Sequence, residues 1–376
     1  MKRKLLDYAK NIPGWRTPKK LVAIAVDDYG TIRLHSKSAR EKLQLAGLEL
    51  DNRFDQYDTL ETREDLEALF EVLRSVKDAD GQPAVFTPYA LSCNPDFEAI
   101  RQSGSYHYQP LTETFAELAA EQPAAYEGAW QMWQAGMDEN LMAPQFHGRE
   151  HLNLHIIEDK MRRQDADIMA CMEHCSMAGL DTRQYPKTIG WTAAFSFYAE
   201  KEVHQFPAIM DTGLKAFREV YGFQPSAFTA PAQQFPPVLE KRLPEWGINF
   251  FDRPFHQKRH VGKGKLVHQF HSNRYNPKQS KGYIVRNVLF EPNNGKQDHP
   301  GQAMRQIEAA FYWNKPAIIS SHRVNFCGHI DETNRTESLR QLKDLLQRIV
   351  RKWPDVEFVS VYDISTLMTR VKNTTR

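Results

Sequence analysis

The sequence predicts an α/β fold with a parallel sheet or barrel, because short apolar runs alternate with segments of helical periodicity. The clearest elements are a strand at 21–26, a helix at 66–73, a strand at 84–87, a strand at 317–321, a helix at 338–352 and a strand at 356–360. This alternation is typical of βαβ units, in which a helix connects parallel neighbours. We expect the polar residues that follow such strands to gather at one edge of the sheet.

The middle of the chain is predicted to be mainly helical. The expected elements are an aromatic, helical insertion at 101–140, a helix from 151 to about 178, helices at 191–200 and 210–220, a helix starting at 236–240, and a basic loop and hairpin at 253–290. No repeat or linker divides these segments. We therefore expect a single catalytic domain over 1–376, with its core at about 20–365.

Composition places the chain among ordinary globular proteins. It has 376 residues, 41% of them hydrophobic and 26% charged, with a formal net charge of +2. This balance gives no reason to expect a nucleic-acid partner, and no apolar run reaches the length of a membrane span. The four scattered cysteines and the lack of an apolar signal segment favour a cytoplasmic location. The oligomeric state is left open.

Two adjacent acids, Asp27 and Asp28, end the first strand and precede Tyr29 and Gly30. Two ionised carboxylates side by side at the end of a buried strand are costly unless a cation or a proton lies between them. Adjacent strand residues point to opposite faces, so both can reach one site only where the strand breaks. Gly30 is suited to that break.

Three histidines lie at positions that suit a metal site. His147 and His151 are separated by three residues, and His322 follows the strand at 317–321. Two histidines and one carboxylate are a donor set typical of catalytic metal ions. We expect a non-helical chain near His147, with His155 facing away from the site. Each pattern alone is common on solvated surfaces, but together they indicate a hydrolytic metal centre.

These motifs resemble those of the polysaccharide deacetylase superfamily, the NodB-type carbohydrate esterases. The segment 25–30 resembles the family's TFDDG-like motif, His147 to His151 resembles its H-[S/T]-x-x-H motif, and 222–231 resembles its third motif. The resemblance implies a distorted (β/α)7-type barrel. It also implies Asp27 as general base, Asp28, His147 and His151 as metal ligands, and His322 as general acid.

The resemblance implies one divalent metal ion, Zn²⁺ foremost, although Co²⁺, Ni²⁺ or Fe²⁺ suit the same ligands. The implied reaction is removal of N- or O-linked acetyl groups from a carbohydrate by metal-activated water. The family's third-motif arginine falls on Thr229, and Asp252 is only a weak match for the family's orienting acid. The predicted substrate contacts are Tyr29, Thr229, Pro231, Arg323 and Asn325.

The stretch between Asp252 and Glu291 contains no acid and many basic residues. It is typical of a solvated loop, and alternatively of a rim that attracts an anionic sugar. Two other functions also remain open: hydrolysis of a small non-carbohydrate amide or imide on the same fold, and carbohydrate binding without catalysis. The expected partner is an acetylated carbohydrate, anionic if the basic stretch contributes to its binding.

Overall fold

The computed structural model describes residues 2–370, and side chains from residue 5 onward. Ten strands form one mostly parallel sheet in the order β10-β11-β7-β6-β5-β2-β1-β13-β12, with β14 pairing with the first residues of β1. Only the β10–β11 pair is antiparallel. The predicted α/β fold is therefore confirmed as a curled sheet. No strand pairing within residues 2–370 closes it into a complete barrel.

The strands of this sheet are β1 (Lys20–Tyr29), β2 (Phe86–Leu91), β5 (Gln145–Gly148), β6 (Ala227–Phe228), β7 (Phe250–Arg253), β10 (Arg274–Asn276), β11 (Lys281–Val285), β12 (Val288–Leu289), β13 (Ala317–His322) and β14 (Val356–Phe358). Two separate two-stranded antiparallel sheets are formed by β3 (Cys93–Pro95) with β4 (Tyr108–Pro110), and by the hairpin of β8 (His256–His260) with β9 (Leu266–Phe270).

The α-helices are α1 (Lys2–Ala9), α2 (Lys37–Leu45), α3 (Arg53–Tyr57), α4 (Arg63–Arg74), α5 (Phe97–Ser103), α6 (Leu111–Glu121), α7 (Pro123–Tyr126), α8 (Ala129–Asp138), α9 (Leu154–Arg163), α10 (Ala166–Glu173), α11 (Phe206–Tyr221), α12 (Pro237–Glu240), α13 (His299–Tyr312), α14 (Glu332–Lys352) and α15 (Val361–Arg370). None of these helices is both long and apolar enough to cross a membrane.

Strand β1 lies at the centre of the sheet and is buried on both faces. Val22, Ile24 and Val26 pack into the large outer core, which the surrounding helices cover. The alternating residues Leu21, Ala23 and Ala25 pack into a smaller inner core, which α15 closes from one end. A strand that is buried on both faces has apolar residues at consecutive positions. This unbroken apolar run made β1 predictable from the sequence.

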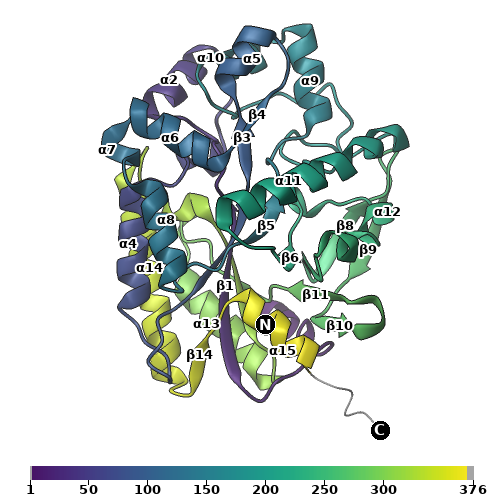
Figure 1. Ribbon diagram of the computed structural model, residues 1–376. Coiled ribbons are helices and arrows are strands. Elements are labelled where there is room, and N and C mark those ends of the chain that lie inside the picture. The colour runs from purple at the N-terminus through teal and green to yellow at the C-terminus, as the bar shows by residue number, and fades with distance from the viewer. Residues whose placement is uncertain (1, 371–376) are drawn as a thin grey trace.

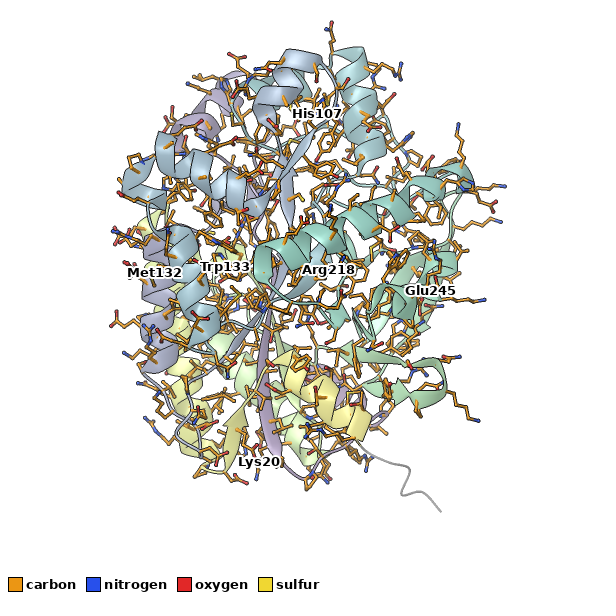
Figure 2. All side chains as sticks on the ribbon, in the orientation of Figure 1. Lys20, His107, Met132, Trp133, Arg218 and Glu245 are labelled. Carbon is orange, nitrogen blue, oxygen red and sulfur yellow. The ribbon has the colours of Figure 1, made fainter. Side chains whose placement is uncertain are left out.

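The strands point their carboxyl ends toward a cap of helices that includes α2, α5, α6, α9 and α10 (Figure 1). In Figure 2, side chains fill the space between sheet and helices, and β1 rises from Lys20 at one end of the molecule toward the cap near His107. Asp27 pairs with His322 in the parallel register of β1 and β13. This register brings two polar residues to the same edge, as the sequence predicts.

Two predicted helices differ from the structure. The expected helix at 191–200 is a series of turns, followed by a 3-10 helix at Glu200–Gln205. Asn153 explains the difference, because its side chain donates to the carbonyls of Ala193 and Ser196, which a helix would have used. The helix expected from 151 to 178 is two helices, α9 and α10, separated by Gln164 in a left-handed conformation.

Candidate active site

The break at the end of β1 brings both acids to one cleft. Asp27 continues the inward row of Leu21, Ala23 and Ala25, whereas Asp28 has a φ of 76°, which is rare for a residue with a side chain. Without this turn, strand alternation would point Asp28 to the opposite face. Both carboxylates line a cleft of about 470 Å³. Backbone strain at such a position is typical of functional sites.

Asp28 meets the two histidines that the sequence pairs with it. Its Oδ1 lies 3.2 Å from Nε2 of His147 and 3.2 Å from Nε2 of His151. His147 sits on β5, and His151 lies in the turn before α9, so the segment is non-helical as predicted. One ligand atom of each residue lies within 4.8 Å of the others, an arrangement that can hold a metal ion.

The hydrogen bonding of His147 shows that this group suits a cation. Its Nδ1 lies 2.8 Å from the carbonyl oxygen of Thr229, so Nδ1 carries the proton and donates it. Its other ring nitrogen, Nε2, faces the Asp28 carboxylate at 3.2 Å and is the atom that could act as a ligand. Ligand atoms about 2.0–2.1 Å from a tetrahedral ion lie about 3.3 Å apart. The donor set therefore fits a metal ion.

Asp28 is buried and His151 is half-buried in this group. Burial alone would raise the pKa of Asp28, but hydrogen bonds from His147 and His151 hold it well below its usual value. Burial lowers the pKa of His151, which favours the neutral ring that binds metals. His155 lies one turn further along, is 46% exposed and approaches Glu202 instead. It faces away from the site, as predicted.

Asp27 is held by an arginine that the motif comparison did not identify. Arg286 pairs with both Asp27 oxygens, at 2.6 and 2.8 Å, and its Nε donates to Asp252 at 2.8 Å. Burial would raise the pKa of Asp27, but Arg286 and the neighbouring imidazoles lower it. Thr229 leaves the third-motif position without an arginine, and Arg286, which follows β11, supplies the cation from another strand.

His322 is held by a second carboxylate that sequence reasoning missed. Its Nδ1 lies 2.6 Å from Glu291, and its Nε2 lies 3.9 Å from Asp27. Burial alone would lower the pKa of His322, but the Glu291 carboxylate raises it to about 9. Arg53 of α3 pairs with Glu291 at 2.6 Å, and Phe54 packs edge-on against the imidazole. His322 is therefore oriented and kept protonated.

The cleft combines these polar groups with an aromatic rim. Arg33 lies over the Trp191 ring at 4.5 Å and pairs with Asp55 at 2.6 Å. The lining residues are Asp27, Asp28, Arg33, Asn52, Phe54, Asp55, His147, His151, Trp191, Thr192, Ala230, Ala232, Gln233 and His322. The structure thus brings together all five residues predicted as catalytic groups or metal ligands.

None of the predicted substrate contacts lines the cleft, so their positions do not support that prediction. Tyr29 and Pro231 are buried, and Thr229 offers only its backbone carbonyl to His147. Asn325 is buried and donates to Glu291. Arg323 begins the 3-10 helix Arg323–Phe326 after β13 and is buried.

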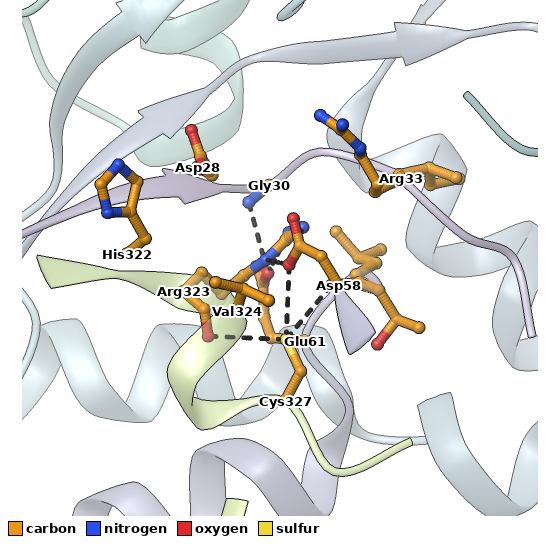
Figure 3. A network of polar contacts seen from close by, with 12 residues as sticks. Asp28, Gly30, Arg33, Asp58, Glu61, His322, Arg323, Val324 and Cys327 are labelled. Atoms are coloured by element: carbon orange, nitrogen blue, oxygen red, sulfur yellow. Dashed lines mark hydrogen bonds and ion pairs between the residues drawn. The ribbon is translucent and has the colours of Figure 1, made fainter. Parts of the chain in front are cut away.

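Arg323 belongs to a separate polar network, drawn in Figure 3. Its guanidinium donates to Asp58 at 3.0 and 3.1 Å and to Glu61 at 2.9 Å. Glu61 also accepts from the backbone N–H of Gly30, just past Asp28. The network therefore ties the end of β13 to the loop that carries Asp28.

No protein-family model matches the chain, and no curated protein matches it. Solved structures are similar to it over most of its length. A probable polysaccharide deacetylase from Pseudomonas aeruginosa PAO1 has 10% identity, 99% of each chain covered and a TM-score of 0.47. PuuE allantoinase has 11% identity, with 98% of this chain and 97% of that chain covered, and the same TM-score of 0.47.

A 4-α-glucanotransferase from Thermococcus litoralis has 10% identity and a TM-score of 0.45, with 95% of this chain and 41% of that chain covered. Polysaccharide deacetylases, which the sequence motifs resemble, are thus among the proteins of similar structure. Because these identities and TM-scores are low, we assign no substrate from them.

Proposed function

We propose that this protein is a metal-dependent hydrolase that removes N- or O-linked acetyl groups from a carbohydrate. The observation that carries the proposal is the cluster of Asp28, His147 and His151, whose ligand atoms all lie within 4.8 Å of one another. Two imidazoles and one carboxylate at this spacing are a donor set typical of a catalytic metal ion. The resemblance of the surrounding motifs to NodB-type deacetylases supports the choice of reaction.

Asp28, His147 and His151 would hold the ion, and Zn²⁺ is the ion we expect, with Co²⁺, Ni²⁺ or Fe²⁺ as alternatives. When bound, a divalent ion supplies Lewis acidity that activates water and polarises an acyl oxygen. Thr229 supports this site through its carbonyl, which fixes the His147 ring with Nε2 directed at Asp28.

Asp27 is the proposed general base and His322 the proposed general acid. A base must be ionised and an acid protonated in the same molecule. Arg286 favours the ionised form of Asp27, and Glu291 favours the protonated form of His322. Both groups line the same cleft, so a proton taken from water at Asp27 and one given to the leaving group at His322 belong to one reaction site.

A second candidate function is hydrolysis of a small amide or imide by the same groups. The volume of the cleft favours it, because about 470 Å³ is within the range of small-molecule sites. Carbohydrate binding without catalysis is less well supported, since a binding site needs neither the paired acid and base nor their separate charge partners.

The proposal is tested by acetate release from metal-loaded protein across a panel of substrates. The panel contains N-acetylated and O-acetylated oligosaccharides, together with linear amides and cyclic imides that carry no sugar. We expect acetate from at least one acetylated carbohydrate and no hydrolysis by the matched Asp27→Asn variant. Hydrolysis of the amides or imides alone would support the second candidate, and no turnover of any substrate would reject both.

The role of His322 is tested with leaving groups of different quality. A good leaving group needs little protonation, so His322→Gln should slow a sugar acetamide strongly and an activated aryl acetate little. It should also remove the alkaline limb of the kcat/KM profile, which we expect near pH 9. Equal slowing of both substrates, or loss of metal, would contradict the assignment.

A further inference from the structure

The β8–β9 hairpin lies against the wall of the cleft. Gln257 of β8 donates to the carbonyl of Gln233, a cleft residue. Beside it, the Gln234 side chain donates to the carbonyl of Lys258 and accepts from the N–H of His260. The turn of the hairpin also contacts the chain that follows the cleft residues Trp191 and Thr192. There the backbone N–H of Lys263 donates to the backbone carbonyl of Tyr198. The hairpin therefore lies beside the cleft; Figure 1 shows β8 and β9 at one side of the molecule, near α12 and β11.

The hairpin carries positive charge that the protein does not neutralise. Beneath it, Arg253, Arg259 and Lys281 all pair with the single carboxylate of Glu240. On its exposed side are Lys258, Lys263 and Lys265, and within residues 2–370 none of these three forms an ion pair. No acid occurs from residue 253 to residue 290. Together these residues give the cleft rim a local positive potential.

The exposed face of the hairpin also presents aromatic rings. His256 pairs across the strands with Phe270, and Lys258 pairs with His268. The His256 ring stacks on Phe270 at 4.9 Å and on His268 at 5.0 Å, and Phe270 is 68% exposed. Phe270 lies on the same hairpin as the exposed Leu266 and Val267, and exposed apolar patches are typical of interaction sites. The lysines around it favour a partner with negative charge.

We propose that this hairpin surface, formed by His256, Lys258, Lys263, Lys265, His268 and Phe270, binds an anionic carbohydrate chain whose acetylated unit occupies the cleft. The inference rests on the proposed function, from which we take the ligand to be a carbohydrate. The positive charge of the hairpin indicates that this carbohydrate is anionic. A uronic-acid polymer has the required chemistry, with a carboxylate on each sugar to meet the lysines. The aromatic rings occupy one small cluster rather than a track, which favours sugar over single-stranded nucleic acid.

Binding is measured with metal-loaded, full-length protein and two probes that share one backbone. The probes are polygalacturonate and its fully methyl-esterified, uncharged form. The test variant is Lys258→Glu/Lys263→Glu/Lys265→Glu. The control is Lys37→Glu/Lys42→Glu/Lys343→Glu, which makes the same change in net charge on exposed helical positions of α2 and α14. We expect the test variant to bind polygalacturonate at least tenfold more weakly at low salt, and the control to bind it like the wild type.

Several results would overturn this inference. The test variant could bind polygalacturonate as tightly as the wild type, or the control variant could lose as much affinity as the test variant. The wild type could also bind both probes equally, or bind single-stranded poly(U) more tightly than polygalacturonate. Alanine replacements of the same three lysines should weaken binding less than the glutamates do.

This binding measurement does not depend on turnover, so it separates the inference from the proposed function. If hydrolysis fails on every substrate while the charge-dependent binding holds, only the function is rejected. If acetate release is found, O-acetylated polygalacturonate should show a raised KM and unchanged kcat in the hairpin variant.

Discussion

Two buried arginines, Arg286 and Arg323, lie on opposite faces of the sheet near the ends of β1 and β13, and each binds two carboxylates. Arg286 holds Asp27 and Asp252, whereas Arg323 holds Asp58 and Glu61.

In each group, one acid has a pKa raised to about 6, Asp252 beside Arg286 and Asp58 beside Arg323. Burial raises the pKa of each acid by more than the arginine lowers it. The groups differ in access, because Asp27 lines the main cleft and the partners of Arg323 do not. The same ionic arrangement therefore borders the main cleft at Arg286 and lies away from it at Arg323.

The largest expected difference is in turnover. Asp27→Asn should lower turnover by about 10²–10⁴-fold, the usual contribution of a positioned base. Asp58→Asn should leave turnover nearly unchanged, because Asp58 does not line the main cleft. Acetate release by metal-saturated protein checks both variants. Equal losses in the two variants would erase the distinction between the two groups.

The next difference is in stability. Arg323→Met leaves two buried carboxylates without their cation, so it should lower the free energy of unfolding by about 3–5 kcal/mol. Arg286→Met should cost a similar amount and should also lower turnover. Arg348→Met, which breaks an exposed pair with Asp344, is the control and should cost about 1 kcal/mol or less. Urea denaturation compares the three, and a cost at Arg323 no larger than the control would contradict this prediction.

A smaller difference concerns pH. The pKa of Asp58 is about 6 in the folded protein and about 3.9 in the unfolded chain, so the folded state binds more protons between pH 4 and 6. Stability contributed by this group therefore falls as pH rises through that window, by about 3 kcal/mol. Asp58→Asn stays neutral and should remove the loss. The free energy of unfolding of wild type and variant at pH 4 and pH 7 measures it, and identical pH dependence would contradict it.

The comparison also shows which parts of the site were predictable from the sequence. Asp27, Asp28 and His322 end or follow apolar strands, and the spacing of His147 and His151 singled out the other two. Their shared edge follows from parallel pairing, which places strand ends together.

Arg286 and Glu291 were missed because their roles depend on how distant strands align. Arg286 reaches Asp252 and Asp27 only because β11 pairs with β7 and the sheet curls back toward β1. A signal was present, since each residue follows a short apolar run, 283–285 and 288–290 respectively. The same positional signal did not bring Arg323 to the cleft, because the chain turns into the 3-10 helix Arg323–Phe326 directly after β13 and Arg323 pairs with Asp58 and Glu61.

The central claim is that Asp28, His147 and His151 bind one divalent ion and that Asp27 does not. The most direct test is the metal content of purified protein by elemental analysis after reconstitution with Zn²⁺. We predict one equivalent in the wild type and in Asp27→Asn, and loss of the ion in Asp28→Asn and in His147→Ala/His151→Ala. Metal retained by the double histidine variant, or lost equally from Asp27→Asn and Asp28→Asn, would contradict the account.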